Sequence, residues 1–216
     1  MSPARFVRNR LAGFAILTLI GCAASPIAIQ ALDAMKDQAA RSDWAALAAS
    51  RVSDCAAGDR VCAQRQALRS QGCRRQAAAG DLSETARRNF LDCAVSAGRA
   101  GRDAVPEEIS AREAYAAALF ARRQARPGSE VCADNTPLLA EADALRTLRP
   151  AEPGPRFLAA SARLTAIARA CTADPPCPTL AAARALLADP PANAASEWQA
   201  LAGGIALTAR RFSCPI

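Results

Sequence analysis

The cysteines constrain this chain more than any other feature. There are nine, and Cys22 stands apart from the others near the N-terminus, which leaves an even number in the rest of the chain. An even set at long, irregular spacings is typical of a disulfide framework in an exported protein. No Cys-x-x-Cys occurs, so the sequence predicts no metal site. The predicted disulfide cysteines are Cys55, Cys62, Cys73, Cys93, Cys132, Cys171, Cys177 and Cys214.

Turn-forming residues suggest how these cysteines pair. Gly-Asp or Asp-Pro-Pro sequences lie between three pairs of cysteines that are neighbours in the chain, and such sequences bring the flanking segments together. The remaining two cysteines then pair by elimination. The expected bridges are Cys55–Cys62, Cys171–Cys177 and Cys73–Cys93, with Cys132–Cys214 as the remainder.

The N-terminus has the layout of an export signal. Residues 1–10 contain three arginines and no acid, and residues 11–29 carry no charge. A basic stretch followed by an apolar run directs secretion, and the basic end stays on the cytoplasmic side. We therefore expect the rest of the chain to lie in the cell envelope, on the periplasmic side.

The residues Leu19-Ile20-Gly21-Cys22 resemble the lipobox of bacterial lipoproteins. The resemblance implies that residues 1–21 are a signal peptide and that Cys22 becomes the lipidated N-terminus. Ala23 follows the cysteine where an Asp would favour retention at the inner membrane. The resemblance therefore implies an outer-membrane lipoprotein. An exported, disulfide-bonded domain is not expected to bind nucleic acid.

The same segment also fits an uncleaved anchor. Residues 11–32 are apolar over a length that suffices for one membrane span of about 20 residues. If the chain is a lipoprotein, residues 22–35 form its tether. Lipoproteins usually carry a polar tether after the cysteine, whereas these residues are largely apolar. A single-pass inner-membrane anchor is therefore the alternative, and simple secretion is a third. Under each of them residues 36–216 form the exported domain.

Apolar residues recur at helical spacing in this domain. Steps of three and four residues run from Phe157 to Cys171 and from Trp198 to Phe212, and no segment alternates with period two. The sequence predicts an all-α fold of about eight helices, paired as antiparallel hairpins by short Pro- and Gly-rich connections. The expected helices span residues 33–55, 61–79, 83–97, 106–125, 137–148, 156–171, 179–188 and 195–211.

One stretch resembles a known helical repeat. In residues 80–98, Ala86, Phe90, Ala94 and Gly98 stand near the small, aromatic, small and turn positions of tetratricopeptide and Sel-like repeats. The resemblance implies a superhelix that presents a concave surface to a peptide or protein partner. No second copy matches, so unrelated alanine-rich hairpins are the alternative.

Alanine makes up about a quarter of the chain. It is the best helix former, but each buried alanine removes little apolar area from water. Disulfides are expected to offset such a thin core, and the fold is predicted to depend on them.

The sequence offers little catalytic chemistry. Histidine is absent, which excludes His-based acid–base catalysis and the Ser-His-Asp and Cys-His nucleophile systems. The only lysine, Lys36, lies beside the expected membrane segment, and the Glu-Ser dipeptide of lytic transglycosylases is absent. We predict no catalytic residues and no cofactor, with an envelope enzyme of unrecognised site as the least favoured alternative.

The remaining hypothesis is an interaction protein. The net charge of +7 comes from arginines interspersed with acids, which is typical of solvated helix faces. We expect a membrane-tethered accessory protein that binds an envelope protein partner, or a single-pass accessory subunit of an integral membrane complex. Arginines near a loop, which we expect to be exposed, are the candidate binding residues: Arg122, Arg123 and Arg126.

Overall fold

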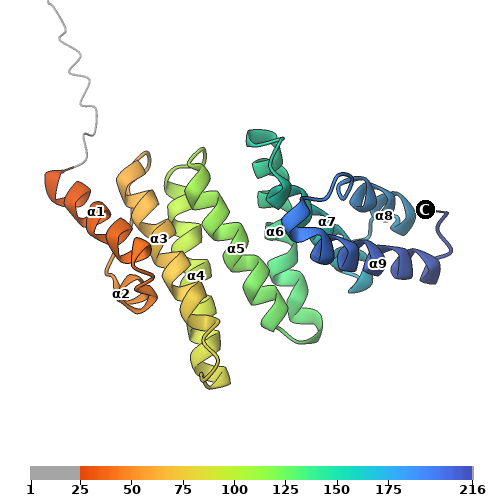
Figure 1. The fold of residues 1–216 in the computed structure, drawn as a ribbon, viewed down its shortest axis with the longest axis horizontal. Coiled ribbons are helices and arrows are strands. Elements are labelled where there is room, and N and C mark those ends of the chain that lie inside the picture. Colours follow the sequence, from red (N-terminus) through yellow and green to blue (C-terminus); the bar gives the residue numbers. More distant parts are fainter. Residues whose placement is uncertain (1–24, 216) are drawn as a thin grey trace, which may run out of the picture.

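The computed structural model describes residues 25–215, and these residues form helices and no strands, as the sequence predicts. The helices from α3 to α7 follow one another in chain order along the longest axis, with α1 and α2 at one end and α8 and α9 at the other (Figure 1). Most helices pack on their neighbours in the sequence, whereas α1 packs mainly on α3, and α3 also contacts α5. The helices are α1 Pro26–Ala40, α2 Trp44–Ala49, α3 Arg60–Ala77, α4 Glu84–Ala104, α5 Ile109–Ala125, α6 Val131–Leu148, α7 Pro153–Ala168, α8 Pro176–Ala185 and α9 Ala195–Arg211, with short 3-10 turns at Gly128–Glu130 and Ala192–Ala194.

The first expected helix is two helices in the structure. The chain breaks at Ser42, whose φ of 58° is left-handed, and Asp43 then caps α2 by accepting a hydrogen bond from the backbone of Ala46. α1 begins inside the stretch expected as a tether. Its side chains Leu32 and Met35 are buried, so this stretch packs against the rest of the protein.

Two further expected helix boundaries are wrong, at Gly98 and at Pro137. Gly98 and Gly101 lie inside α4, where a Cβ at Gly98 would stand 2.7 Å from the Cα of Tyr115. The missing side chain therefore lets α4 and α5 approach closely. α6 likewise begins at Val131 and runs through Pro137, where the sequence predicted its start.

Apolar side chains gather in two larger clusters, which both include residues of α7, and in a small one of Ala63, Ala104 and Val105. The first cluster has members from every helix from α3 through α7 and contains Tyr115, Leu119 and Leu138. The second joins α7, α8 and α9 around Trp198 and Ile205, which lie on the predicted apolar stripe of α9. About half of the other buried members are alanines, so the helices lie close together around a small core.

The predicted signal peptide, the lipidation site Cys22 and most of the alternative span 11–32 lie outside the described residues. The signal peptide, the lipidation site and the membrane span stay predictions. Within residues 25–215, no helix is both long and apolar enough to cross a membrane.

The eight cysteines of the domain form four disulfides, as predicted. Every bridge lies within one pair of helices or between a helix and the loop beside it. The bridges are Cys55–Cys62, Cys73–Cys93, Cys132–Cys171 and Cys177–Cys214, with Cα–Cα distances of 5.5, 5.9, 5.1 and 5.1 Å.

The first two pairings are confirmed, and the predicted Cys171–Cys177 and Cys132–Cys214 bridges are wrong. In an antiparallel hairpin the start of one helix lies beside the end of the next. Cys132 near the start of α6 therefore meets Cys171 just after α7, and Cys177 at the start of α8 meets Cys214 just after α9. Helix geometry decides these pairings, and the turn between Cys171 and Cys177 does not.

We expect the bridges to differ in their effect on stability. Loop-closure entropy gives about 4 kcal/mol for Cys132–Cys171, with a separation of 39 residues, and about 2 kcal/mol for Cys55–Cys62, with a separation of 7. Denaturant unfolding of the Cys132→Ser/Cys171→Ser and Cys55→Ser/Cys62→Ser variants measures both losses. A greater loss for the shorter loop would contradict this account.

Candidate functional site

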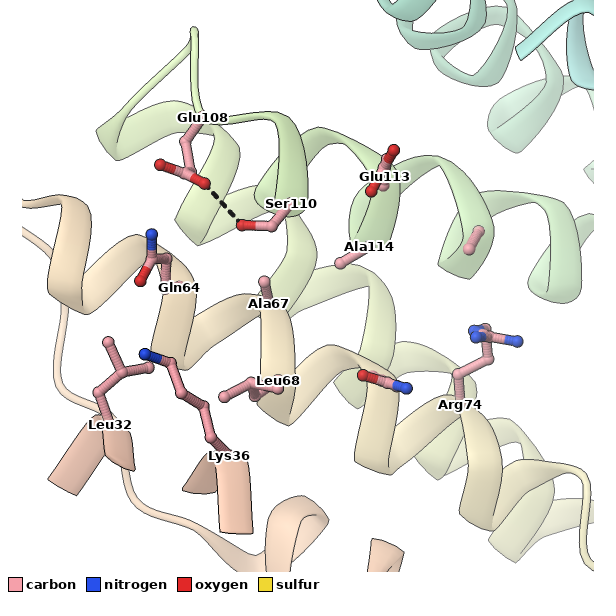
Figure 2. Close-up of a pocket in the computed structure, with 12 residues that line it drawn as sticks. Leu32, Lys36, Gln64, Ala67, Leu68, Arg74, Glu108, Ser110, Glu113 and Ala114 are labelled. Carbon is pink, nitrogen blue, oxygen red and sulfur yellow. Dashed lines mark hydrogen bonds between the residues drawn. The ribbon is translucent and has the colours of Figure 1, made fainter. Parts of the chain in front are cut away.

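Three helices line an open groove in the described part of the chain. α1 and α5 both pack on α3, and the space between them measures about 580 Å³ (Figure 2). Ala67 of α3 with Ala114 and Ala117 of α5 lines it with small side chains, and Leu32 and Leu68 add apolar surface. The small side chains leave room for an occupant between α3 and α5.

Polar side chains from all three helices also line this α1/α3/α5 groove. Gln64, Gln71 and Arg74 come from α3, Lys36 from α1, and Glu108 precedes α5. Amide and guanidinium groups donate hydrogen bonds to carbonyl and carboxylate oxygens. The groove therefore has the chemistry to bind a peptide.

Arg74 is the half-buried cation of the groove. Burial lowers its pKa, and the neighbouring charge of Arg75 lowers it further. No acid within residues 25–215 pairs with Arg74. It also lines a second hollow of about 300 Å³ farther along the α3–α5 seam, together with Arg87 and Gln124. Arg74 therefore stands where the two hollows meet.

Glu113 lies at the α5 side of the groove and also contacts Arg149, the residue after α6. Its carboxylate accepts a hydrogen bond from Arg149 at 3.1 Å. Burial raises the pKa of Glu113, and the positive charge of Arg149 opposes this rise. The half-buried carboxyl is thus easier to protonate than an ordinary glutamate.

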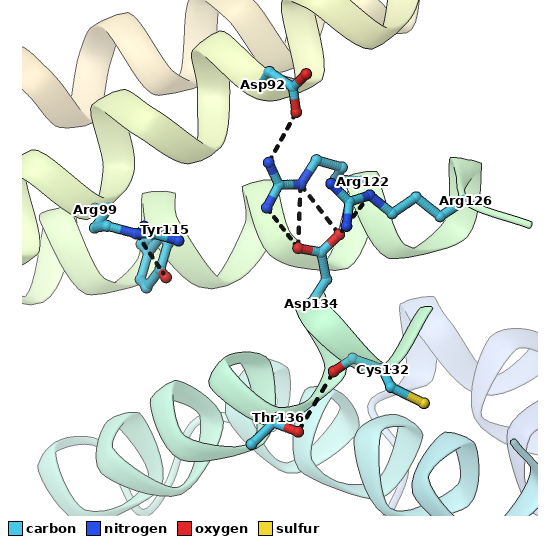
Figure 3. A network of polar contacts seen from close by, with 8 residues as sticks. All are labelled: Asp92, Arg99, Tyr115, Arg122, Arg126, Cys132, Asp134 and Thr136. Atoms are coloured by element: carbon cyan, nitrogen blue, oxygen red, sulfur yellow. Dashed lines mark hydrogen bonds and ion pairs between the residues drawn. The ribbon is translucent and has the colours of Figure 1, made fainter. Parts of the chain in front are cut away.

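The arginines predicted as a binding surface lie elsewhere and make internal contacts (Figure 3). Arg122 pairs with Asp134 at 2.6 Å and with Asp92 at 2.8 Å, and Arg126 pairs with Asp134 at 3.3 Å. Burial lowers the pKa of Arg122, but its hydrogen bonds to these two carboxylates outweigh that effect and raise it. This cluster joins α5 to α6, because Asp134 belongs to α6 and the arginines come from the end of α5. The Asp134 side chain is only 1% exposed.

Arg123 is buried, which corrects the expectation that it is exposed. Its guanidinium donates to Asn135 at 2.8 Å and to Ser161 at 2.7 Å, and it lies over the ring of Phe120. Burial lowers the pKa of Arg123 to about 10, although the charge of Asp134 opposes the shift. This arginine connects α5, α6 and α7.

A second buried acid, Glu141 of α6, joins three helices. It accepts a hydrogen bond from Arg112 of α5 at 2.6 Å and lies 3.3 Å from Arg102 of α4. The burial of Asp134 and Glu141 was not predicted from the sequence. A signal was present, because Asp134, Leu138, Glu141 and Leu145 follow the steps of one helix face. Acids on an apolar stripe indicate buried ion pairs.

The fold and the groove define an all-α, disulfide-bonded protein with a candidate peptide-binding groove. The chain matches no protein family, no curated protein and no solved structure. Among the residues that the structure describes, no three His, Cys, Asp or Glu side chains gather as metal ligands would.

Asp134→Ala is expected to destabilise the protein by about 3 kcal/mol, because it leaves Arg126 without an acid and Arg122 with only the exposed Asp92. Asp33→Asn breaks the exposed Lys36–Asp33 pair and is expected to cost less than about 1 kcal/mol. Denaturant unfolding of the two variants compares them. Similar losses would show that the Asp134 cluster contributes little.

Glu113 predicts a pH-dependent stability. Because the pKa of Glu113 is raised in the folded state, its protonated carboxyl stabilises the fold. This stabilisation is fully present below the ordinary pKa of glutamate and is lost as pH rises through the raised pKa. Glu113→Gln cannot ionise, so its stability relative to the natural protein is expected to rise between about pH 4 and pH 7. Glu197→Gln, at an exposed position of α9, controls for the loss of a charge. An equal trend in both variants would contradict the prediction.

Proposed function

We propose that this chain is a membrane-tethered, periplasm-facing helical protein that acts as an interaction or accessory subunit of a cell-envelope assembly. The observation that carries the proposal is the α1/α3/α5 groove, which combines a lining of small side chains with a cation that no acid within residues 25–215 neutralises. Such a groove suits a segment of a partner protein. The predicted export signal and the disulfides support an envelope location.

The start of α1 supports a tether at this end of the molecule. Ile27 is 78% exposed and Ile29 is 44% exposed, and they directly follow the uncharged N-terminal segment. Exposed isoleucines at this point suit contact with lipid. The same observation favours the second candidate, a single-pass subunit, because the apolar run continues without a charge into α1.

Intact mass measured on protein extracted from its native membrane separates the two candidates. A lipoprotein is expected to begin at Cys22 with an added lipid mass, whereas a single-pass subunit keeps the N-terminal segment. Reduction is expected to add two hydrogens for each of the four disulfides. A shortened chain without lipid would contradict both forms of tether.

Site-specific photo-crosslinking in cells tests the groove. A photoreactive residue at Gln71, inside the groove, is expected to give one cross-linked species that mass spectrometry identifies as an envelope protein. The matched control is Arg184, an exposed position on α8 outside the groove. Equal cross-linking from both positions, or none from Gln71, would contradict a binding role for this groove.

A further inference from the structure

The charges along the α3–α5 seam are arranged with a polarity. Glu108 and Glu113 line the groove at the part nearer the start of α5. Arg74 and Arg87 line the hollow nearer the end of α5, and no acid lines that hollow. Arg88, the neighbour of Arg87, pairs with Glu84 at 2.9 Å, whereas no acid within residues 25–215 pairs with Arg87. An occupant therefore meets a positive field at the Arg74 end.

Two glutamines of α3 determine what else the groove can recognise. The side-chain amide of Gln66 donates to the Ser53 carbonyl at 3.3 Å, whereas no hydrogen bond within the described part of the chain engages the side chain of Gln64 or Gln71. Seven residues of helix separate these two, a rise of about 10 Å. An extended chain covers the same distance in about three residues. The glutamines can therefore reach main-chain groups three residues apart.

The spacing and the lining favour an extended occupant over a helical one. A helix satisfies its main-chain groups internally, so it would leave the two amides without partners. An extended segment offers carbonyl and N–H groups at every residue. Ala67, Ala114 and Ala117 let such a main chain lie close to α3 and α5.

From these observations we propose that the groove binds an extended segment of a partner protein that places an Asp or Glu carboxylate against Arg74 and its main chain against Gln64 and Gln71. This inference rests on the proposed function and names the chemistry of the partner. Arg87 adds a second positive charge for a following acid. The half-buried position of Arg74 strengthens its bond to a carboxylate relative to an exposed pair.

The test uses the purified full chain and two synthetic peptides. One is a fluorescein-labelled ten-residue peptide of alanine and glycine with two adjacent glutamates at its centre, and its twin has two glutamines instead. Fluorescence anisotropy is expected to show about tenfold tighter binding of the glutamate peptide. Arg74→Gln is expected to remove this preference, and Arg87→Gln to reduce it. Arg184→Gln removes an equal charge from α8 and is expected to leave the preference intact.

A variant with a filled groove provides a second measurement. Ala117→Leu places a larger side chain between α3 and α5 and is expected to weaken both peptides, with the fold checked by circular dichroism. The inference would be overturned by equal affinity for the twin peptides or by no binding of either peptide at millimolar concentration. It would also be overturned if Arg74→Gln and Arg184→Gln lost the preference for the glutamate peptide equally. If cross-linking from Gln71 still succeeds, only the acidic-segment inference fails. If that cross-linking also fails, the proposed function fails with it.

Discussion

The fold depends on how closely its helices approach one another. Alanine fills much of the buried surface, and Gly98 brings the backbone of α4 against Tyr115 of α5. Close approach increases dispersion contacts between backbones, but small side chains remove little apolar area from water. A chain built in this way needs other interactions to hold each helix in its register, and the disulfides and buried ion pairs supply them.

Disulfides and buried ion pairs divide this task along the chain. Bridges join α3 to α4, α6 to α7, and the start of α8 to the segment after α9. Within residues 25–215 no bridge joins α5 to another helix. At α5 the buried carboxylates of Asp134 and Glu141 form ion pairs with arginines from α4 and α5. A covalent link tolerates a thin core, whereas the ionic link requires correct packing, because each buried acid must keep its partners.

Helical periodicity predicted the all-α fold and the extent of α3 and α9 to within a few residues, because those patterns are local. The errors arise where a distant contact overrides a local signal. Gly98 looked like a helix end and is a contact with α5. Cys171 and Cys177 looked like partners across a turn, yet each pairs with a cysteine more than thirty residues away in the chain. The groove itself combines three helices, so no single segment of sequence could indicate it.

The arginines show how structural and functional charges can be distinguished in such a chain. Arg122, Arg123 and Arg126 looked suited to binding because they cluster near a loop, but α6 supplies an acid or an amide to each of them. Their interactions are therefore already satisfied inside the protein. Arg74 is comparably removed from water, yet no acid in residues 25–215 compensates its charge. Because burying a charge without a partner is costly, a half-buried cation in a groove gains the most from an incoming carboxylate. The α5 arginines therefore stabilise the fold, whereas the uncompensated charge of Arg74 supports the proposed acidic partner.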